Sequence, residues 1–255
     1  SKPHEARQAA DRWREIHSNE TPEERSARRF AKRSLTSKPA SEGLVESKVG
    51  WIPRNWRPTT VGEIASRVRG AVQPRSRPGE LFEHFSIPAF DGFRRPDRVS
   101  GSTILSGKTP LTGEAVLISK LNPATPRVWW ARPGGVGHAV CSGEFVALEP
   151  SGGTPISYLY AAARHDPGFS DHVLAHVSGT TGSRQRVRPD DILSAPIAWP
   201  GDEYVREFAA FADPLYELVH TLEAESDTLV ALRDTVLPTL VSGEVRLRDL
   251  KEAVG

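Results

Sequence analysis

The chain has 255 residues, of which 38% are apolar and 25% charged, and its formal net charge is +1 at neutral pH. This composition is typical of a soluble globular protein with one large domain, or one domain plus appendages. The sequence offers no run of 18 apolar residues that could span a membrane and no apolar core of a secretory signal. Cys141 is the only cysteine, which excludes a disulfide framework and a multi-cysteine zinc site. We therefore expect a cytoplasmic protein, and the lack of methionine indicates a removed initiator or a fragment.

The charges are distributed unevenly along the chain. Residues 1–47 carry 10 basic and 8 acidic side chains, residues 48–200 carry 18 and 12, and residues 201–255 carry 5 and 12. A basic middle segment suits phosphate groups, whereas an acidic C-terminal segment would be repelled by them. A solvated charged surface explains the same counts, so the distribution alone does not decide the function.

Residues 1–47 are expected to form a helical extension followed by a linker. Helical patterns run from Pro3 to His17 and from Thr21 to Leu35, where Thr21 can cap the second helix. The stretch 36–47 is rich in Ser, Pro and Lys, as linkers are. A docking extension is the simpler interpretation, and a basic arm that contacts DNA is the alternative.

Residues 48–200 predict one mixed domain of the α+β class. The stretch 50–58 is expected to be extended because Pro53 lies between Trp51 and Trp56. Apolar and β-branched runs predict strands, and amphipathic runs predict helices. The expected strands are 86–90, 115–121, 127–131 and 144–150; the expected helices are 61–68, 156–164 and 169–177. A glycine-rich loop, 178–187, and a leading segment, 190–200, complete the domain.

Residues 201–255 predict a long helix and a tail. Over 202–237, apolar residues recur at alternating intervals of three and four, which indicates a coiled-coil seam. An ordinary amphipathic helix that packs on its own domain is the alternative. Glu225 interrupts the seam and is expected to fix its register, while Pro214 either starts the long helix or kinks it. The seam residues are Phe208, Phe211, Leu215, Leu218, Leu222, Leu229, Leu232 and Val236.

No catalytic constellation is found in the sequence. The glycine-rich nucleotide motifs are absent. His172 and His176 are four residues apart on an expected helix, but no third ligand is near in sequence, so we interpret them as structural. Asn122-Pro123 resembles the start of the catalytic loop of adenine methyltransferases, yet Thr125 stands where that loop needs an aromatic residue. We therefore expect no metal, no cofactor and no catalysis in this chain.

The loop 178–188 is the best candidate for a binding site. It combines short hydroxyl donors, glycines that allow close backbone approach, and arginines, a mixture that suits phosphate contacts. Gln185 can also read a base edge with its amide. A basic and aromatic set near 120–132 adds further candidates, and a solvated basic turn is the alternative interpretation. The candidate DNA-binding residues are Lys120, Arg127, Arg132, Ser178, Thr180, Thr181, Ser183, Arg184, Gln185 and Arg186.

The order of motifs resembles that of one family, the DNA specificity subunits of type I restriction–modification systems. The similar stretches together cover about residues 48–250. They are GWIPRNW with VGEI (50–64), SIPAFD (86–91), VLISKLNPATPRVWW (116–130), SGEFVALEP (142–150), HVSGTTGSRQRV (176–187) and LRDTVLPTLVSGEVRL (232–247).

This resemblance implies a target recognition domain that reads half of a bipartite DNA site, followed by a spacer helix. Family members usually carry two such domains and two helices, whereas this sequence has one of each. The difference predicts a half-length subunit that forms a homodimer, or a fragment of a longer subunit. From Phe208 to Val236 the helix would span roughly 43 Å, which corresponds to roughly 12–13 base pairs.

The sequence thus predicts a non-catalytic specificity subunit that binds double-stranded DNA. Its implied partner is a modification subunit that methylates adenine with S-adenosylmethionine, and a restriction subunit can join for cleavage. Two alternatives stay open: the recognition segment of a fused methyltransferase–nuclease, and a stand-alone dimeric DNA-binding regulator.

Overall fold

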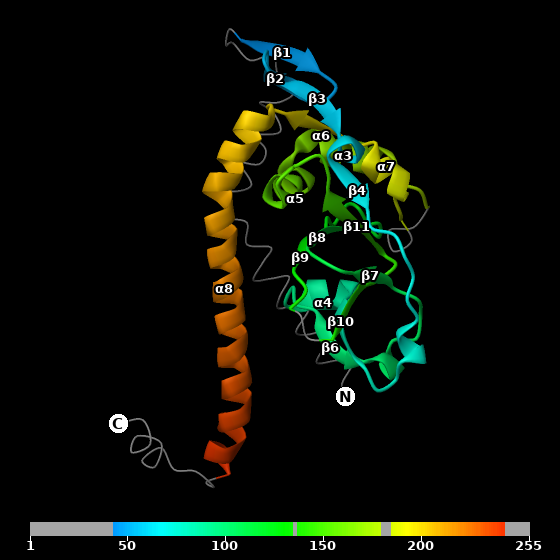
Figure 1. Ribbon diagram of the computed structural model, residues 1–255, viewed down its shortest axis with the longest axis vertical. Coiled ribbons are helices and arrows are strands. Elements are labelled where there is room, and N and C mark those ends of the chain that lie inside the picture. Colours follow the sequence, from blue (N-terminus) through cyan, green and yellow to red (C-terminus); the bar gives the residue numbers. More distant parts are fainter. Residues whose placement is uncertain (1–42, 135–136, 180–184, 243–255) are drawn as a thin grey trace, which may run out of the picture. The chain divides into compact units, whose positions relative to one another are not determined.

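The structure is a computed structural model that describes residues 43–134, 137–179 and 185–242. The chain divides into two compact units, Ser1–Asp202 and Glu203–Gly255. The first unit contains all the described strands and several short helices, and the second is dominated by one long helix (Figure 1). This is the α+β class that the sequence predicts. The helices expected within residues 1–35 lie outside the described residues.

The described chain opens with an antiparallel hairpin of β1 (Leu44–Ser47) and β2 (Gly50–Pro53). The linker expected over 36–47 is therefore wrong at its end, because Leu44–Ser47 pairs with β2 in a regular ladder. The next strand, β3 (Arg57–Thr60), pairs antiparallel with β12 (Pro196–Trp199), which lies far along the chain. This pairing brings the two ends of the domain together. Both prolines in 50–58 lie in strands, but the expectation that the whole stretch is extended is wrong, because Arg54 and Asn55 form a turn between β2 and β3.

One sheet of the domain is four-stranded and antiparallel, in the order β4-β11-β8-β9. Its strands are β4 (Ala65–Arg67), β8 (Ala115–Ser119), β9 (Val128–Ala131) and β11 (Phe145–Pro150). The three longer strands confirm the apolar runs read from the sequence. The helix expected over 61–68 is only half right: α3 (Val61–Ile64) ends after one turn, and β4 continues from it to pair with β11.

A second four-stranded sheet, in the order β6-β5-β10-β7, was not predicted. Its strands are β5 (Leu81–Phe85), β6 (Asp97–Ser100), β7 (Thr109–Leu111) and β10 (His138–Cys141). The β10–β5 pair is parallel and the other two pairs are antiparallel. Two 3-10 turns, η1 (Pro74–Ser76) and η2 (Gly101–Thr103), lie in the connections beside this sheet.

Helix α4 (Ile87–Gly92) replaces the strand expected over 86–90. The Ser86 side chain caps this helix, because its Oγ accepts a hydrogen bond from the Ala89 amide at 3.1 Å. Pro88 lies in the first turn, where a missing amide hydrogen costs nothing. The cap and the proline both favour a helix. Together they outweigh the strand preference of the β-branched and aromatic side chains in this short segment.

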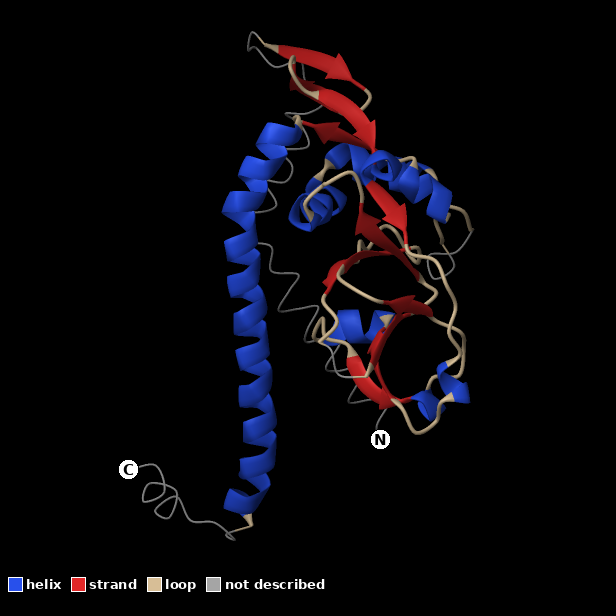
Figure 2. Cartoon of the chain, viewed as in Figure 1, coloured by secondary structure: helices blue, strands red, loops and turns tan. Residues whose placement is uncertain are grey.

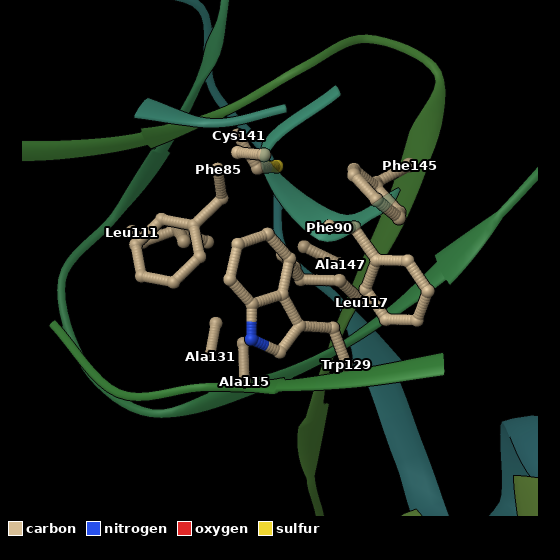
Figure 3. Close-up of a cluster of buried hydrophobic side chains, with 11 residues drawn as sticks. Phe85, Phe90, Leu111, Ala115, Leu117, Trp129, Ala131, Cys141, Phe145 and Ala147 are labelled. Carbon is tan, nitrogen blue, oxygen red and sulfur yellow. The ribbon is translucent and has the colours of Figure 1, made fainter. Parts of the chain in front are cut away.

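The two sheets and α4 meet around Trp129 (Figure 3). The Trp129 ring contacts Phe85 of β5, Phe90 of α4 and Phe145 of β11, with centroid separations of 4.8, 5.7 and 6.3 Å. Such tilted and edge-on pairs stabilise a core beyond the area that they bury. Trp129 is therefore a core residue, and Trp130, its neighbour on β9, points to the opposite face of the sheet.

Three helices complete the domain: α5 (Ile156–His165), α6 (Pro167–Ala175) and α7 (Pro189–Leu193). Helix α5 contacts β8, β9 and β11. Asp166 joins α5 to α6 and caps the second helix, and its other carboxylate oxygen accepts from the Ala198 amide of β12 at 3.0 Å. Burial nonetheless raises the pKa of this carboxyl group. The carboxylate of Asp191 accepts from the Arg188 amide at 3.2 Å and so caps α7.

The second unit is the continuous helix α8 (Asp202–Val241), which is 40 residues long (Figure 2). Pro214 lies inside this helix, so no separate short helix precedes it. Most of the seam side chains are exposed in the single chain: Phe211, Leu215, Leu218, Leu222, Leu229 and Leu232 are each at least half exposed. None of the described helices is long and apolar enough to cross a membrane.

Candidate nucleic-acid interface

The candidate site is built where the β8–β9 connection, residues 120–127, meets the two ends of the loop 178–187. The amide of Asn122 donates to the Gln185 carbonyl at 2.9 Å, and the amide of Val187 donates to the Lys120 carbonyl at 3.0 Å. Ser178 and Arg186 form two reciprocal backbone hydrogen bonds, both 2.8 Å long. The backbone thus brings Lys120, Ser178, Gln185 and Arg186 to one place, although Lys120 precedes the loop, Ser178 opens it, and the other two lie near its closing end.

A tight turn at Asn122 shapes this connection. Asn122 has φ +48°, in the left-handed region that asparagine tolerates better than most residues. Its carbonyl accepts from the Thr125 amide at 2.9 Å, which closes the turn. The Asn122-Pro123 pair therefore has a structural role here. This agrees with the presence of Thr125 where the methyltransferase loop needs an aromatic residue.

Arg186 presents its side chain at the surface beside Glu144. The guanidinium Nη2 lies 2.9 Å from the Glu144 Oε1, and the two side chains are 57% and 34% exposed. An ion pair this exposed stabilises the fold by at most about 1 kcal/mol. The arginine can therefore exchange the carboxylate for a phosphate group at low cost.

Arg127 is held differently from Arg186. Its Nε donates to Asp91 Oδ1 at 2.6 Å and its Nη2 donates to Oδ2 at 2.8 Å, while its side chain is only 13% exposed. A bidentate pair of this kind is short, strong and geometrically specific. In this arrangement Arg127 fastens the end of α4 to the 120–127 connection, and its predicted contact with a base stays a prediction.

Arg132 is not brought together with the other candidates. It follows β9 at the end opposite Arg127, a separation of roughly 16 Å along the strand. Its guanidinium lies 4.2 Å from the Trp130 ring centroid and 3.7 Å from Glu114, and the side chain is 12% exposed. Four further candidates, Thr180, Thr181, Ser183 and Arg184, lie outside the described residues, so their role stays a prediction.

Sequence reasoning missed the two acidic residues that organise this region, Asp91 and Glu144. Neither carries a local motif: Asp91 is placed by α4, and Glu144 lies in the turn between β10 and β11. The turn is tied to the site because the Lys120 amide donates to the Glu144 carbonyl at 2.8 Å. Asp91 lies 36 positions from Arg127 and Glu144 lies 42 positions from Arg186, so only the tertiary structure shows that they are partners.

His172 of α6 and His176, the C-cap residue of that helix, stack on each other close to the start of the loop. Their ring centroids are 4.1 Å apart, and His176 Nδ1 lies 2.8 Å from the His172 carbonyl oxygen. Burial, with the neighbouring His176, lowers the pKa of His172. Within the described ranges no group of three His, Cys, Asp or Glu side chains is placed to hold a metal ion.

Comparison with solved structures identifies the fold. An HsdS subunit from Thermoanaerobacter tengcongensis matches with a TM-score of 0.52 and 20% sequence identity, over 72% of this chain and 49% of that one. A chain from a structure of a type I R-M system, solved to explain complex assembly and conformational transition, matches with a TM-score of 0.50 over the same shares. No protein-family model and no curated protein matches the sequence.

The matched region spans about half the length of these solved chains. The likeness is one of backbone arrangement, since one residue in five is identical. This likeness agrees with the resemblance to the same family that the order of motifs in the sequence indicates. The chain therefore has the fold of the S subunits of type I restriction–modification systems.

Proposed function

We propose that this chain is the DNA specificity subunit of a type I restriction–modification complex. It chooses the DNA sequence, and a partner subunit carries out the chemistry. The observation that carries the proposal is the combination of the S-subunit fold with the surface where the 120–127 connection meets the closing end of the loop 178–187. That surface presents Arg186 and Gln185 from a backbone fixed by four hydrogen bonds.

The chemistry of this surface suits double-stranded DNA. An exposed guanidinium binds phosphate oxygens and holds the protein in register on the duplex. Gln185, which is partly exposed next to Arg186, has an amide that can pair with an adenine edge in the major groove. Contacts to phosphate give affinity, whereas amide contacts to bases give specificity.

We propose further that two copies assemble through α8. The apolar seam of this helix is exposed in the single chain, and a stripe of leucines in water favours association. A second copy supplies a matching seam. The matched region spans about half of each solved S subunit, so two copies of this chain would together correspond to a whole one. An antiparallel pair places two recognition domains at opposite ends and predicts a palindromic target split by unread bases.

The proposed partner is a methyltransferase subunit that binds S-adenosylmethionine and methylates adenine after turning the base out of the duplex. A restriction subunit can join the same assembly. A cytoplasmic location follows from this proposal, because the substrate is the cell's DNA.

The test mixes the purified chain with a candidate methyltransferase subunit from the same genome. We expect the two proteins to sediment together, and methyl transfer from S-adenosylmethionine to duplex DNA only when both are present. A chain that binds one DNA sequence tightly but never joins the methyltransferase would be a regulator. A reading frame that continues into a catalytic domain would instead make the chain a segment of a fused enzyme.

A further inference from the structure

An aromatic ring stands out at the C-terminal end of α4. Phe93 is 79% exposed, as much as any large apolar side chain that the structure describes. A single exposed apolar side chain is common and has no meaning by itself. Two features of its surroundings set this one apart, namely the backbone that follows it and the charges beside it.

The backbone after Phe93 turns into the left-handed region at Arg94, where φ is +55°. The amides of Phe93 and Arg94 both donate to the Ala89 carbonyl, at 3.3 and 3.0 Å, which closes the last turn of α4. Glycine is the usual residue at this position of a helix end, because a Cβ atom is crowded there. A bulky residue kept in such a conformation often marks a functional site.

Both arginines after Phe93 lie over aromatic rings. The Arg94 guanidinium carbon is 5.1 Å from the Phe90 ring centroid, and that of Arg95 is 5.6 Å from the Phe93 ring centroid. A ring attracts a cation through its quadrupole. The result is an exposed apolar ring with two guanidinium groups held beside it.

This aromatic tip, residues 93–95, is fixed to the proposed DNA-binding surface. Asp91 in the last turn of α4 binds Arg127 through two hydrogen bonds of 2.6 and 2.8 Å. Arg127 ends the 120–127 connection, whose other end is bonded to Gln185 and Val187. On the inner side, Phe90 packs against Trp129 in the core. The tip is therefore rigidly supported and belongs to the same continuous network as Arg186.

We propose that Phe93 is a wedge that inserts between two neighbouring base pairs of the bound duplex. Arg94 and Arg95 then contact the phosphates on either side of that step. Apolar wedges flanked by arginines are a general means of unstacking and bending DNA. Pyrimidine–purine steps such as TA and CA/TG unstack most easily, so the wedge selects a flexible step without a hydrogen bond to any base. This inference rests on the proposed function and adds a specificity-determining residue to it.

The experiment uses the complex of the full chain with its methyltransferase subunit, on the duplex that this complex methylates. 2-Aminopurine replaces each adenine in turn, except the methylated one, and its fluorescence reports unstacking. We expect a rise at one step in each half-site with the wild-type chain. Phe93→Ala should abolish the rise and weaken binding about tenfold, the size of one aromatic stacking contact.

Two comparisons show whether the ring acts as an apolar wedge. Phe93→Leu should keep most of the fluorescence rise, because a leucine can also separate base pairs. Leu105→Ala, at a side chain that is 73% exposed in the segment between η2 and β7, should change neither fluorescence nor affinity. Arg94→Gln and Arg95→Gln should each lower the salt dependence of binding by about one ion and keep the rise.

Three outcomes would overturn the inference, and they are distinguishable. Equal fluorescence and affinity for Phe93→Ala and wild type would remove the wedge and leave the proposed function intact. A Phe93→Ala chain that no longer sediments with the methyltransferase before DNA is added would make the tip a protein-binding surface. A wild-type complex that methylates no duplex would remove the proposed function itself, and the wedge with it.

Discussion

Arg186 and Glu144 form an ion pair of 2.9 Å at the surface where the 120–127 connection meets the loop 178–187. The two residues lie 42 positions apart in the sequence. Their backbones are brought together through Lys120, which bonds the Glu144 carbonyl with its amide and the Val187 amide with its carbonyl. An exposed cation beside a partly exposed carboxylate is well suited to exchange that partner for DNA phosphate.

The first prediction concerns this pair. Arg186→Ala should weaken binding of the assembled complex to all duplexes alike and reduce the salt slope of log K by about 1, because one phosphate contact is lost. Glu144→Gln should have the opposite effect and tighten binding at low salt, because it removes a competing negative charge. Fluorescence anisotropy titrations at several salt concentrations measure both. Unchanged salt slopes in the two variants would contradict a phosphate-binding role for Arg186.

The second prediction concerns Arg127, which is bound bidentately by Asp91 and largely buried. Arg127→Ala should cost about 1.5–3 kcal/mol of stability, the range for hydrogen bonds to charged groups. In a domain of this size that lowers Tm by several degrees. Arg127→Lys should recover only part of the loss, because lysine cannot donate two parallel hydrogen bonds.

The matched comparison for Arg127 is Arg186→Ala, which should leave Tm within about a degree of the wild type because exposed pairs contribute little. Thermal melts followed by circular dichroism measure both variants. If Arg127→Ala melts with the wild type and loses only DNA binding, Arg127 reads DNA and does not fasten α4.

The third prediction concerns the seam of α8. Leu218→Glu or Leu222→Glu should convert a dimer into a monomer, because each places a charge in a contact that excludes water. Both side chains are more than half exposed in the single chain, so the fold of one protomer should not suffer. Ala224→Glu introduces the same charge two positions after Leu222, off the seam, and should keep the dimer. Sedimentation velocity distinguishes the two states, and identical profiles for all three variants would argue against the seam.

The fourth prediction concerns Cys141, which is fully buried between β5 and β7. Burial raises the pKa of its thiol to about 11, so the folded protein holds almost no thiolate at pH 8. The reaction with a thiol reagent such as DTNB should therefore be very slow in the native protein and fast after unfolding. Rapid labelling of the native chain would show that the core around Trp129 opens easily.

The same thiol predicts the direction of a pH effect. Because its pKa is raised in the folded state, the unfolded chain loses this proton first as the pH rises. The contribution to stability is therefore complete below about pH 9 and is lost progressively toward pH 11. A Cys141→Ser variant, which cannot ionise in this range, provides the comparison in urea titrations at pH 8 and pH 10.5.

Long elements with a clear pattern could be predicted from the sequence. The run 115–121 is apolar and contains β-branched residues, so its strand could be recognised without knowledge of its partners. Helix α5 was recognised in the same way, and α8 is long enough for its period to be unmistakable. In each of these elements, most residues have the same local preference for a helix or for a strand.

The second sheet could not be predicted because its strands are short and carry charges. Glu83 is 2% exposed in β5, a burial that composition alone would exclude. Tertiary contacts satisfy its carboxylate: Oε2 accepts from the Gly134 amide at 2.7 Å and Oε1 lies 3.3 Å from Arg98. The central β10–β5 pair is parallel and joins segments more than 50 residues apart. No local pattern contains that information.

The site could be predicted in part. The mixture of hydroxyl, glycine and arginine residues located the loop 178–188, and its closing end does meet Lys120. Arg127 and Arg132 both belong to the basic and aromatic set near 120–132, but proximity in the sequence does not say where a residue lies relative to the loop 178–188. The structure places the two arginines at opposite ends of β9.

The central claim is that this chain gives a methyltransferase its DNA sequence specificity through two copies of one recognition domain. The direct test is to reconstitute the chain with the methyltransferase, incubate the complex with a random-sequence duplex library and S-adenosylmethionine, and read the methylated positions. The account predicts a palindromic site of two half-sites separated by a fixed number of unread base pairs, and no methylation without this chain. A contiguous or asymmetric site, or the same methylation pattern in its absence, would contradict it.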